Sequence, residues 1–272
     1  MREMLGGLRP PAPGLRVSVV VPARNEEALI GACLRALAIQ RGVEPEEYEV
    51  LLVLDDCTDA TAERALEVAA EYPTVRLYLL QGPGKGSGHA RHVGMETAGA
   101  RLLALDAPRG LIASTDADTV VASDWLSAQL AALDAGSQAI GGRIILADDE
   151  SLPQQLADWH AERGRVRHRK LLEDPARAGK AEHWQFSGAS LALTAEVYKE
   201  IGGLEPPASL EDEHLEKVLR THGVPIDRLL CVRVTTSARL VGRATRGLSH
   251  DLAMAGSRFR VSGFGESPKP GA

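Results

Sequence analysis

The 272-residue sequence has no long hydrophobic run, few cysteines and no excess of positive charge. No apolar stretch approaches the roughly 20 residues with which a helix crosses a bilayer, and the N-terminal residues lack the apolar core of a signal peptide. We therefore expect a cytoplasmic protein with no integral membrane segment. Cys33, Cys57 and Cys231 form no C-x-x-C pair, which argues against a zinc site or a disulfide framework. The net charge of −6 gives no general attraction to nucleic acid.

Two common nucleotide-binding signatures are also absent. The first strand-to-helix turn, residues 22–27, contains no glycine, so it cannot form the G-x-G-x-x-G loop of a dinucleotide-binding domain. In the glycine-rich stretch 82–88, Lys85 is followed by Gly86, where a P-loop needs serine or threonine. This stretch is interpreted either as a flexible lip whose lysine reaches a phosphate or as an ordinary mobile surface loop.

Strand-like and helix-like segments alternate along the chain. The predicted strands are 17–21, 50–54, 75–80 and 111–114, followed by 139–146, 186–193 and 226–232. The predicted helices are 28–37, 60–70, 151–172, 194–201 and 210–221. Regular alternation in the first half is typical of an α/β fold with a Rossmann-like, mostly parallel sheet flanked by helices. The second half is less regular, so we expect a mixed arrangement there.

Asp116 and Asp118 follow directly after the predicted strand 111–114. In an extended segment, residues i and i+2 point to the same side, so the two carboxylates can aim at one point. Carboxylate oxygens are preferred ligands of Mg²⁺ and Mn²⁺. Ligands of open α/β sheets bind beyond the carboxyl ends of the strands, where residues 22–26, 55–59 and 82–88 would also gather. The sequence therefore predicts a cation site in this crevice, although a turn or helix cap is the simpler explanation of an isolated Asp-x-Asp.

Five short blocks occur in an order found in a known enzyme family. They are VSVVVPARNEE at 17–27, VLDDCTDAT at 53–61, GHARHVG at 88–94, TDAD at 115–118 and LEDE at 210–213. Together they resemble the GT-A fold glycosyltransferases, most closely glycosyltransferase family 2, over roughly residues 16–246. The resemblance implies a hexosyltransferase that uses Mn²⁺ or Mg²⁺ to transfer a sugar from a UDP- or GDP-sugar to a small-molecule or glycan acceptor.

The resemblance also implies a division of the chain and roles for single residues. We expect a flexible N-terminus (1–15), a nucleotide-sugar-binding half (16–135), an acceptor-binding half of the same domain (136–262) and a disordered tail (263–272). The implied nucleotide-sugar-binding residues are Pro22, Ala23, Arg24, Glu26, Asp55, Lys85, Arg91 and Asp116. The implied metal ligands are Asp118 and Asp116, joined by His250 if the chain follows some related retaining enzymes, and the implied acceptor segment is Gly188, Ala189 and Ser190.

Three aromatic or basic groups of the second half offer further candidates. Arg239, Arg243 and Arg246 share one face if their segment is helical, and can then close over a diphosphate or simply form a solvated basic face. Trp159, His160, His183 and Trp184 are candidates for stacking on sugars or for ordinary packing. The arginine-rich stretch 163–170 is interpreted either as a solvated helix face or as a receptor for a phosphorylated acceptor.

An inverting transfer needs a general base on the acceptor hydroxyl, and the family resemblance places it within Glu211, Asp212 and Glu213. Successive helix residues are about 100° apart, so only one of the three can face the sugar well. Asp212 is the predicted base and Glu211 its catalytic neighbour, although an acidic first turn is also favoured by the helix dipole alone. A retaining enzyme similar to glucosyl-3-phosphoglycerate synthases would need no such base. Alternatives of another class are a sugar-phosphate nucleotidyltransferase and a non-catalytic nucleotide-binding module.

Overall fold

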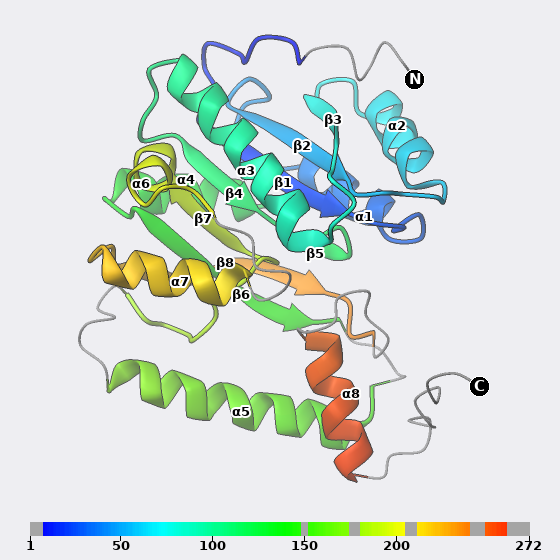
Figure 1. Cartoon of the computed structure of the whole chain (residues 1–272), viewed down its shortest axis with the longest axis vertical. Helices are drawn as coiled ribbons and strands as arrows, with labels where there is room; N and C mark the ends of the chain where they lie inside the picture. The colour runs from blue at the N-terminus through cyan, green and yellow to red at the C-terminus, as the bar shows by residue number, and fades with distance from the viewer. Residues whose placement is uncertain (1–7, 148–151, 174–179, 205–210, 240–247, 260–272) are drawn as a thin grey trace.

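The chain forms one eight-stranded sheet with helices on both faces (Figure 1). A computed structural model describes residues 8–147, 152–173, 180–204, 211–239 and 248–259. The strands are β1 (Val17–Ala23), β2 (Tyr48–Leu54), β3 (Leu77–Gln81), β4 (Leu111–Ser114), β5 (Thr119–Val121), β6 (Ala139–Leu146), β7 (Leu191–Thr194) and β8 (Ile226–Thr236). The helices are α1 (Ile30–Ala38), α2 (Thr61–Glu71), α3 (Ser87–Ala104), α4 (Trp125–Asp134), α5 (Gln154–Leu172), α6 (Ala195–Glu200), α7 (Glu211–Thr221) and α8 (Leu248–Phe259).

The strand order is β3-β2-β1-β4-β7-β6-β8-β5. β1 pairs in parallel with β2 and β4, and β2 pairs in parallel with β3. β7 is antiparallel to β4 and to β6, β8 is parallel to β6, and β5 is antiparallel to β8. The predicted α/β class is confirmed, with a parallel first half and a mixed second half that share one continuous sheet.

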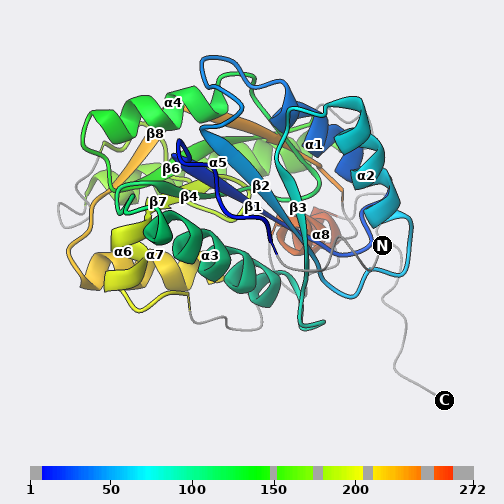
Figure 2. The same cartoon turned by 90° about the horizontal axis from the view of Figure 1, so that it is seen from above.

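Strands β1 and β2 are buried along their whole length. Their β-branched and leucine-rich sequences suit this position, because a parallel strand with helices on both faces has no solvent side. Val19 packs in the core beneath α1, α2 and α4, whereas its neighbour Val20 packs in the core beneath α3, α6 and α7. Figure 2 shows the sheet between these two helical layers.

The long helix α3 was not predicted from the sequence. Glycines within it lower its intrinsic helix propensity, and its apolar residues do not form a clear stripe. Tertiary packing supplies the reason for one of these glycines: a Cβ atom at Gly94 would lie 2.3 Å from the Val20 side chain. Gly94 therefore allows α3 to lie close against β1, at the cost of a weaker sequence signal.

Other predicted elements differ from the structure in part. The strand predicted at 186–193 is limited to β7, because the chain turns through Gly188 between the bridged residues Ser187 and Ser190. The short strand β5 and the helices α4 and α8 were not predicted. Residues 1–7 of the expected flexible N-terminus and the whole expected tail, 263–272, lie outside the described residues. Among the helices of the described part, none has the length and apolarity of a membrane span.

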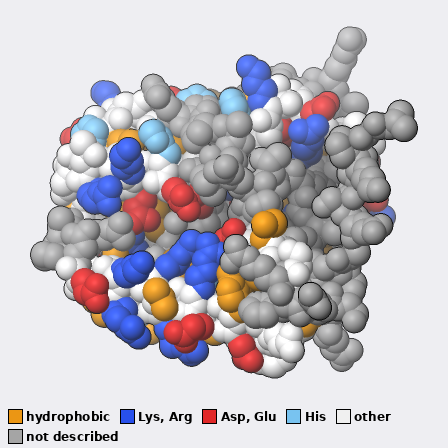
Figure 3. Space-filling view, turned by 60° about the horizontal axis from the view of Figure 1, so that its bottom comes forward, with side chains coloured by type: hydrophobic (Ala, Val, Ile, Leu, Met, Phe, Trp, Pro, Cys, Tyr) orange, Lys and Arg blue, Asp and Glu red, His pale blue; other side chains and the backbone are white. Residues whose placement is uncertain are grey.

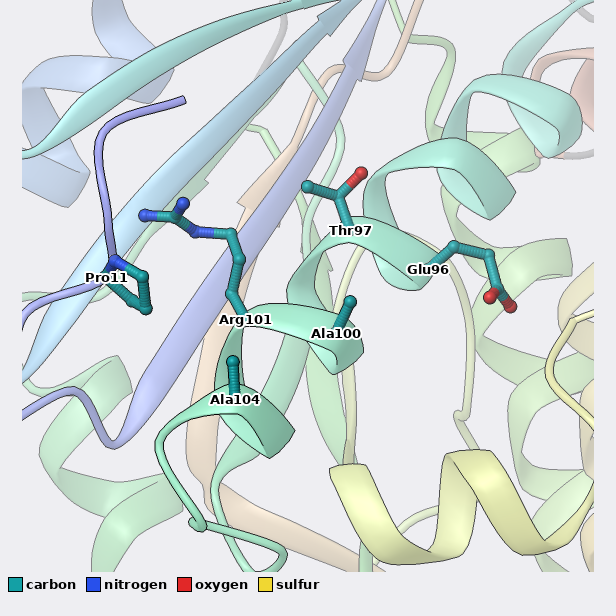
Figure 4. A pocket seen from close by; sticks show the side chains of 6 residues that line it. All are labelled: Pro11, Glu96, Thr97, Ala100, Arg101 and Ala104. Carbon is teal, nitrogen blue, oxygen red and sulfur yellow. The ribbon is translucent and has the colours of Figure 1, made fainter. Parts of the chain in front are cut away.

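A buried ion pair joins β2 to α3. Arg101 Nε and Nη2 donate to the two carboxylate oxygens of Glu49 at 2.7 and 2.6 Å, and Glu49 has no exposed surface. Arg101 also lies 4.8 Å from the ring centre of Tyr78. Arg101 also lines a pocket of about 530 Å³, together with Pro11 and with other residues of α3. Figure 4 shows the side chains that line this pocket.

Replacing Arg101 with alanine should strongly destabilise the protein. The change leaves the Glu49 carboxylate buried without its cation, which typically costs about 3–5 kcal/mol in free energy of unfolding. Urea denaturation measures this loss. Arg64→Ala is the matched control, because its pair with Glu67 is exposed on α2 and screened by solvent, so its loss should change stability far less. Equal losses in the two variants would contradict the assigned role of the buried pair.

Candidate active site

The loops that follow β1, β2 and β3 are joined by side-chain to backbone hydrogen bonds. Asn25 Oδ1 accepts a bond of 2.7 Å from the amide of Thr58. Both carboxylate oxygens of Asp55 accept bonds from the glycine-rich loop, at 2.7 Å from the amide of Gly84 and 2.8 Å from that of Gly86. These contacts join three polar loops at the carboxyl ends of the parallel strands, where the fold predicts a ligand-binding crevice.

Two acidic residues of this crevice are held by one arginine that follows β8. Arg239 donates from Nη1 and Nη2 to the two carboxylate oxygens of Glu26, at 2.9 and 2.8 Å. The same Nη2 lies 2.9 Å from Oδ2 of Asp118. The Asp118 backbone is fixed as well, because its carbonyl accepts a bond from the amide of Ser237. The loops after β1, β4 and β8 therefore meet at Asp118.

Negative charge is concentrated around Asp118. Burial and the neighbouring Asp116 carboxylate raise the pKa of Asp118 to about 6, although Arg239 acts in the opposite direction. Beneath them lies the thiol of Cys33, whose pKa is raised by burial and then by the charges of Asp118, Asp116 and Glu26. The folded protein thus holds three carboxylates close together, an arrangement that a bound cation would stabilise.

The donor atoms fit a hard divalent cation whose shell is completed by a ligand. Within the part of the chain that the structure describes, no group of three or more His, Cys, Asp or Glu side chains is arranged to hold a metal ion by itself. Asp116 and Asp118 would supply carboxylate oxygens, and Mg²⁺ commonly takes its remaining ligands from water and substrate phosphates. The carboxylate oxygens of Asp116 and Asp118, and the repulsion between their charges, both fit a site for a divalent cation.

Arg91 connects the acidic crevice to the second half of the chain. Its guanidinium is fully enclosed and donates to Asp116 Oδ1 at 2.7 Å, to Glu211 Oε1 at 3.1 Å and to the carbonyl of Gly188 at 3.1 Å, as well as to the hydroxyl of Ser114. Burial lowers the pKa of Arg91, but Asp116 and Glu211 outweigh it and the net shift is upward. Arg91 therefore remains charged and positions both carboxylates.

Asp212 stands in the first turn of α7, beside Glu211. Its Oδ2 accepts a bond of 3.3 Å from the amide of Gly188, and its Oδ1 accepts one of 2.9 Å from the amide of Glu213. The Asp212 side chain is partly exposed, whereas Glu211 is buried against Arg91. The structure thus separates the two candidates: Asp212 is accessible to an acceptor and Glu211 is engaged in an ion pair.

The remaining residues predicted to bind the nucleotide lie around the same crevice. Pro22 and Ala23 are buried at the end of β1, Arg24 is exposed and lies 3.5 Å from Asp56, and Lys85 is exposed on the glycine-rich loop. Both oxygens of Asp55 are used by that loop, so its observed role is to shape the loop. Its contact with a nucleotide base stays a prediction.

The predicted acceptor segment runs beneath the crevice. A Cβ atom at Gly188 would lie 2.4 Å from the Arg91 guanidinium, so glycine is required for the chain to pass here. The carbonyl of Ala189 accepts a bond of 2.9 Å from Thr115, and the buried hydroxyl of Ser190 accepts one of 3.0 Å from Trp125. These side chains support the floor of the site, and their contact with an acceptor remains a prediction.

Two of the predicted site residues fall wholly or partly outside the described residues. Arg243, together with Arg246, lies in 240–247, which the structure does not describe. His250 lies in the first turn of α8, but its side chain is outside the described part. Their predicted roles are therefore untested.

Two features of the site were not predicted. Cys33 belongs to the buried core, and its thiol lies 3.5 Å from the Asp116 carbonyl beneath the carboxylates. The pairing of Arg239 with Glu26 joins residues that are 213 positions apart. Neither contact leaves a local pattern in the sequence, although the opposite charges of Arg239 and Glu26 mark those two residues as candidate partners.

A buried histidine near the acceptor segment should make stability depend on pH. Burial lowers the pKa of His183 to about 4, more than its bond to the Leu229 carbonyl raises it. Its Nδ1 accepts a bond of 3.0 Å from the amide of Gln185, which a protonated ring cannot accept. Between its ordinary pKa near 6.5 and pH 4, the unfolded chain binds a proton here that the folded chain does not, so stability falls as pH falls, by roughly 3 kcal/mol in total.

Urea denaturation at the two ends of this window measures the effect. His183→Gln should lower stability at neutral pH but should lose less of it on acidification than the unchanged protein. His222→Gln is the control, since His222 is exposed at the end of α7. An unchanged pH slope in His183→Gln would show that other groups cause the acid sensitivity.

Solved structures with the same architecture identify the fold as GT-A. A mannosyltransferase from Pyrobaculum calidifontis in complex with GDP-Man and Mn²⁺ is similar over 98% of this chain and 71% of its own, with a TM-score of 0.60 and 19% identity. The Staphylococcus aureus protein TarS, residues 1–349 in complex with UDP-GlcNAc, is similar over 89% of this chain and 65% of its own, with a TM-score of 0.57 and 18% identity. The expected GT-A fold is confirmed.

The sequence itself is matched by the model of glycosyl transferase family 2, over residues 18–200. The chain belongs to this family of glycosyltransferase enzymes. Dodecaprenyl-phosphate galacturonate synthase from Rhizobium johnstonii is 35% identical over 103 residues, covering 38% of this chain and 30% of the relative. Dolichyl-phosphate beta-glucosyltransferase from Drosophila melanogaster is also 35% identical over 103 residues, covering 35% of this chain and 32% of the relative. The matched regions thus span about a third of these curated relatives.

Proposed function

We propose that this chain transfers a hexosyl group from a nucleotide-diphosphate sugar to an acceptor hydroxyl, with inversion at the anomeric carbon. The observation that carries the proposal is that Arg91 and Gly188 connect the carboxylates at Asp116 and Asp118 with the carboxylate of Asp212. Asp116 and Asp118 lie at the carboxyl edge of the parallel strands, and Arg91 links Asp116 to the segment that holds Asp212. A donor site at Asp116 and Asp118 and a general base at Asp212 would thus lie on segments that Arg91 connects.

Asp118 and Asp116 would hold Mn²⁺ or Mg²⁺. When bound, the cation supplies electrostatic stabilisation of the negative charge that develops on the departing nucleoside diphosphate. Arg239 and the exposed Lys85 are the cationic side chains placed to bind phosphate oxygens from the protein side. Arg239 is now paired with two carboxylates, so donor binding would redistribute its hydrogen bonds.

Asp212 would take the proton of the acceptor hydroxyl as the sugar is transferred. Its carboxylate is accessible, and its two backbone hydrogen bonds hold it in one orientation. Glu211 acts through Arg91 as a positioning residue.

The similar proteins support a nucleotide-sugar donor, since the solved structures contain UDP-GlcNAc in one case and GDP-Man with Mn²⁺ in the other. The names of the curated relatives include polyprenyl-phosphate glycosyl products, which makes a phosphorylated lipid one acceptor to test. Both points are inferences from similarity.

The experiment is a panel of UDP-, GDP- and ADP-sugars assayed for hydrolysis and transfer with Mn²⁺, Mg²⁺ or EDTA. We expect metal-dependent release of a nucleoside diphosphate from one class of donor, and a product of inverted configuration by proton NMR. Release of pyrophosphate would instead indicate a nucleotidyltransferase. Retained configuration would exclude Asp212 as the base, and nucleotide binding without turnover would indicate a binding module.

A further inference from the structure

Arg239 lies on two carboxylates of the predicted donor site at once. Its Nη1 and Nη2 atoms donate to the two oxygens of Glu26, and the same Nη2 lies 2.9 Å from Oδ2 of Asp118. Glu26 is predicted to line the nucleotide pocket, and Asp118 is predicted to hold the cation. One guanidinium therefore covers oxygens that two different parts of the donor complex would need.

The backbone around this contact is fixed, whereas the arginine side chain is free to turn outward. The buried Glu26 donates from its amide to the Thr61 hydroxyl at 2.8 Å. The Arg239 amide donates to the hydroxyl of Ser237 at 3.3 Å, and the Ser237 amide donates to the Asp118 carbonyl at 3.2 Å. The Arg239 side chain is 28% exposed. The guanidinium can thus leave the carboxylates without any change in the strands or helices.

Arg239 competes with a divalent cation for Asp118. A guanidinium and a dication on the same carboxylate repel each other, and this repulsion is stronger in a partly buried site than in water. The Asp118 side chain is 14% exposed, so solvent screens the two charges little. With Arg239 in place, binding of a free metal ion to Asp118 is therefore disfavoured.

A nucleoside diphosphate would remove this competition. Phosphate oxygens accept pairs of parallel hydrogen bonds from a guanidinium group, so Arg239 can exchange its carboxylate partners for phosphate partners. The negative charge of the diphosphate also offsets the repulsion between Arg239 and a cation. The exchange would free Asp118 for the ion and Glu26 for the nucleotide.

We propose that Arg239 is an internal counter-cation that excludes free metal ions from the empty donor site, so that the divalent cation and the nucleotide bind together. This inference rests on the proposed function and describes how its donor site is filled. The effect is local to Arg239. On the described part of the face in Figure 3, Lys and Arg side chains lie beside Asp and Glu side chains, so that surface has no single sign of charge with which to attract or repel an ion.

The test is titration of Mn²⁺ alone into the full chain, followed by the electron paramagnetic resonance signal of the free ion. Arg239→Gln should bind Mn²⁺ at least about tenfold more tightly than the unchanged protein, because a like charge beside the ion is removed. The matched control is Arg233→Gln, which removes the same charge from an exposed pair with Asp124 on β8 and should leave Mn²⁺ binding unchanged. No gain in Arg239→Gln, or an equal gain in the control, would overturn the proposal.

Two further variants show whether the gain arises from the charge of Arg239 and at Asp118. When Arg239→Gln is added to Asp118→Asn, Mn²⁺ affinity should not rise, because the carboxylate that Arg239 covers is already neutral. Arg239→Lys keeps the positive charge and should bind Mn²⁺ more weakly than Arg239→Gln. A full gain in either variant would show that Arg239 does not exclude the ion through its charge at Asp118, and would count against the inference.

Titration of Mn²⁺ at saturating UDP or GDP separates this inference from the proposed function, with a protein-free blank for ions that bind the nucleotide in solution. The nucleotide should raise the Mn²⁺ affinity of the unchanged protein, and Arg239→Gln should reduce this coupling at least about tenfold. Coupling of equal size in both proteins overturns the role of Arg239 alone. Tighter binding of Mn²⁺ alone by the variant, with no nucleotide binding by either protein, counts against the nucleotide-sugar donor alone.

Discussion

Replacing Asp118 with asparagine should lower the rate of glycosyl transfer by about 10³-fold, the cost typical of removing one electrostatic group that stabilises a transition state. The substitution keeps the shape of the side chain but removes the charge that would hold the cation. Calorimetric titration should show weaker Mn²⁺ binding in the presence of the nucleoside diphosphate. This binding measurement does not depend on finding the acceptor.

The same variant should not be less stable. In metal-free protein, burial and the carboxylates of Asp116 and Glu26 disfavour the charged form of Asp118 more than Arg239 favours it, so removing its charge should raise the free energy of unfolding measured with EDTA. Asp134→Asn is the control, because Asp134 is exposed at the end of α4 and should affect neither activity nor metal binding. Unchanged turnover and Mn²⁺ binding in Asp118→Asn would refute the metal role.

Replacing Asp212 with asparagine should lower kcat for transfer by about 10³-fold, within the range reported for loss of a general base. The amide cannot accept the acceptor proton, although it can still accept the bond from the Gly188 amide. The KM for the donor should change little, because Asp212 acts on the acceptor side and contributes in the transition state. Steady-state kinetics with each substrate varied in turn measures both quantities.

Two neighbouring variants make this result specific. Glu213→Gln changes an exposed residue of the same helical turn and should retain most of the activity. Glu211→Gln weakens the contact with Arg91 and should reduce kcat less than Asp212→Asn, with some loss of stability. Full transfer by Asp212→Asn would favour a retaining reaction, which needs no such base.

Short sequence patterns predicted the features that depend on residues close together in the chain. Buried strands read as continuous apolar runs, as in β1 and β2, and the carboxylates at Asp116 and Asp118 stand in one short segment. The acidic first turn of α7 was found in the same way. Elements whose sequence signal is weak, such as the glycine-containing α3 and the three-residue strand β5, were not found.

Contacts between distant segments could not be predicted. Arg91 was expected to touch the donor directly, whereas its hydrogen bonds are used by Asp116, Glu211 and the Gly188 carbonyl. The arginines of α5 were open to two interpretations, because a helix sequence shows which residues share a face but not which face turns inward.

The sequence by itself determined the alternation of strands and helices, the order of the acidic segments and the family to which they belong. These follow from patterns within short windows, where side-chain spacing and backbone geometry are directly linked. Only the tertiary structure decided that Arg239 pairs with Glu26 and Asp118, that Arg91 joins the two halves of the site, and that Arg167 faces inward. Those relations depend on how the sheet and helices pack, and packing brings together charges that are far apart in the chain.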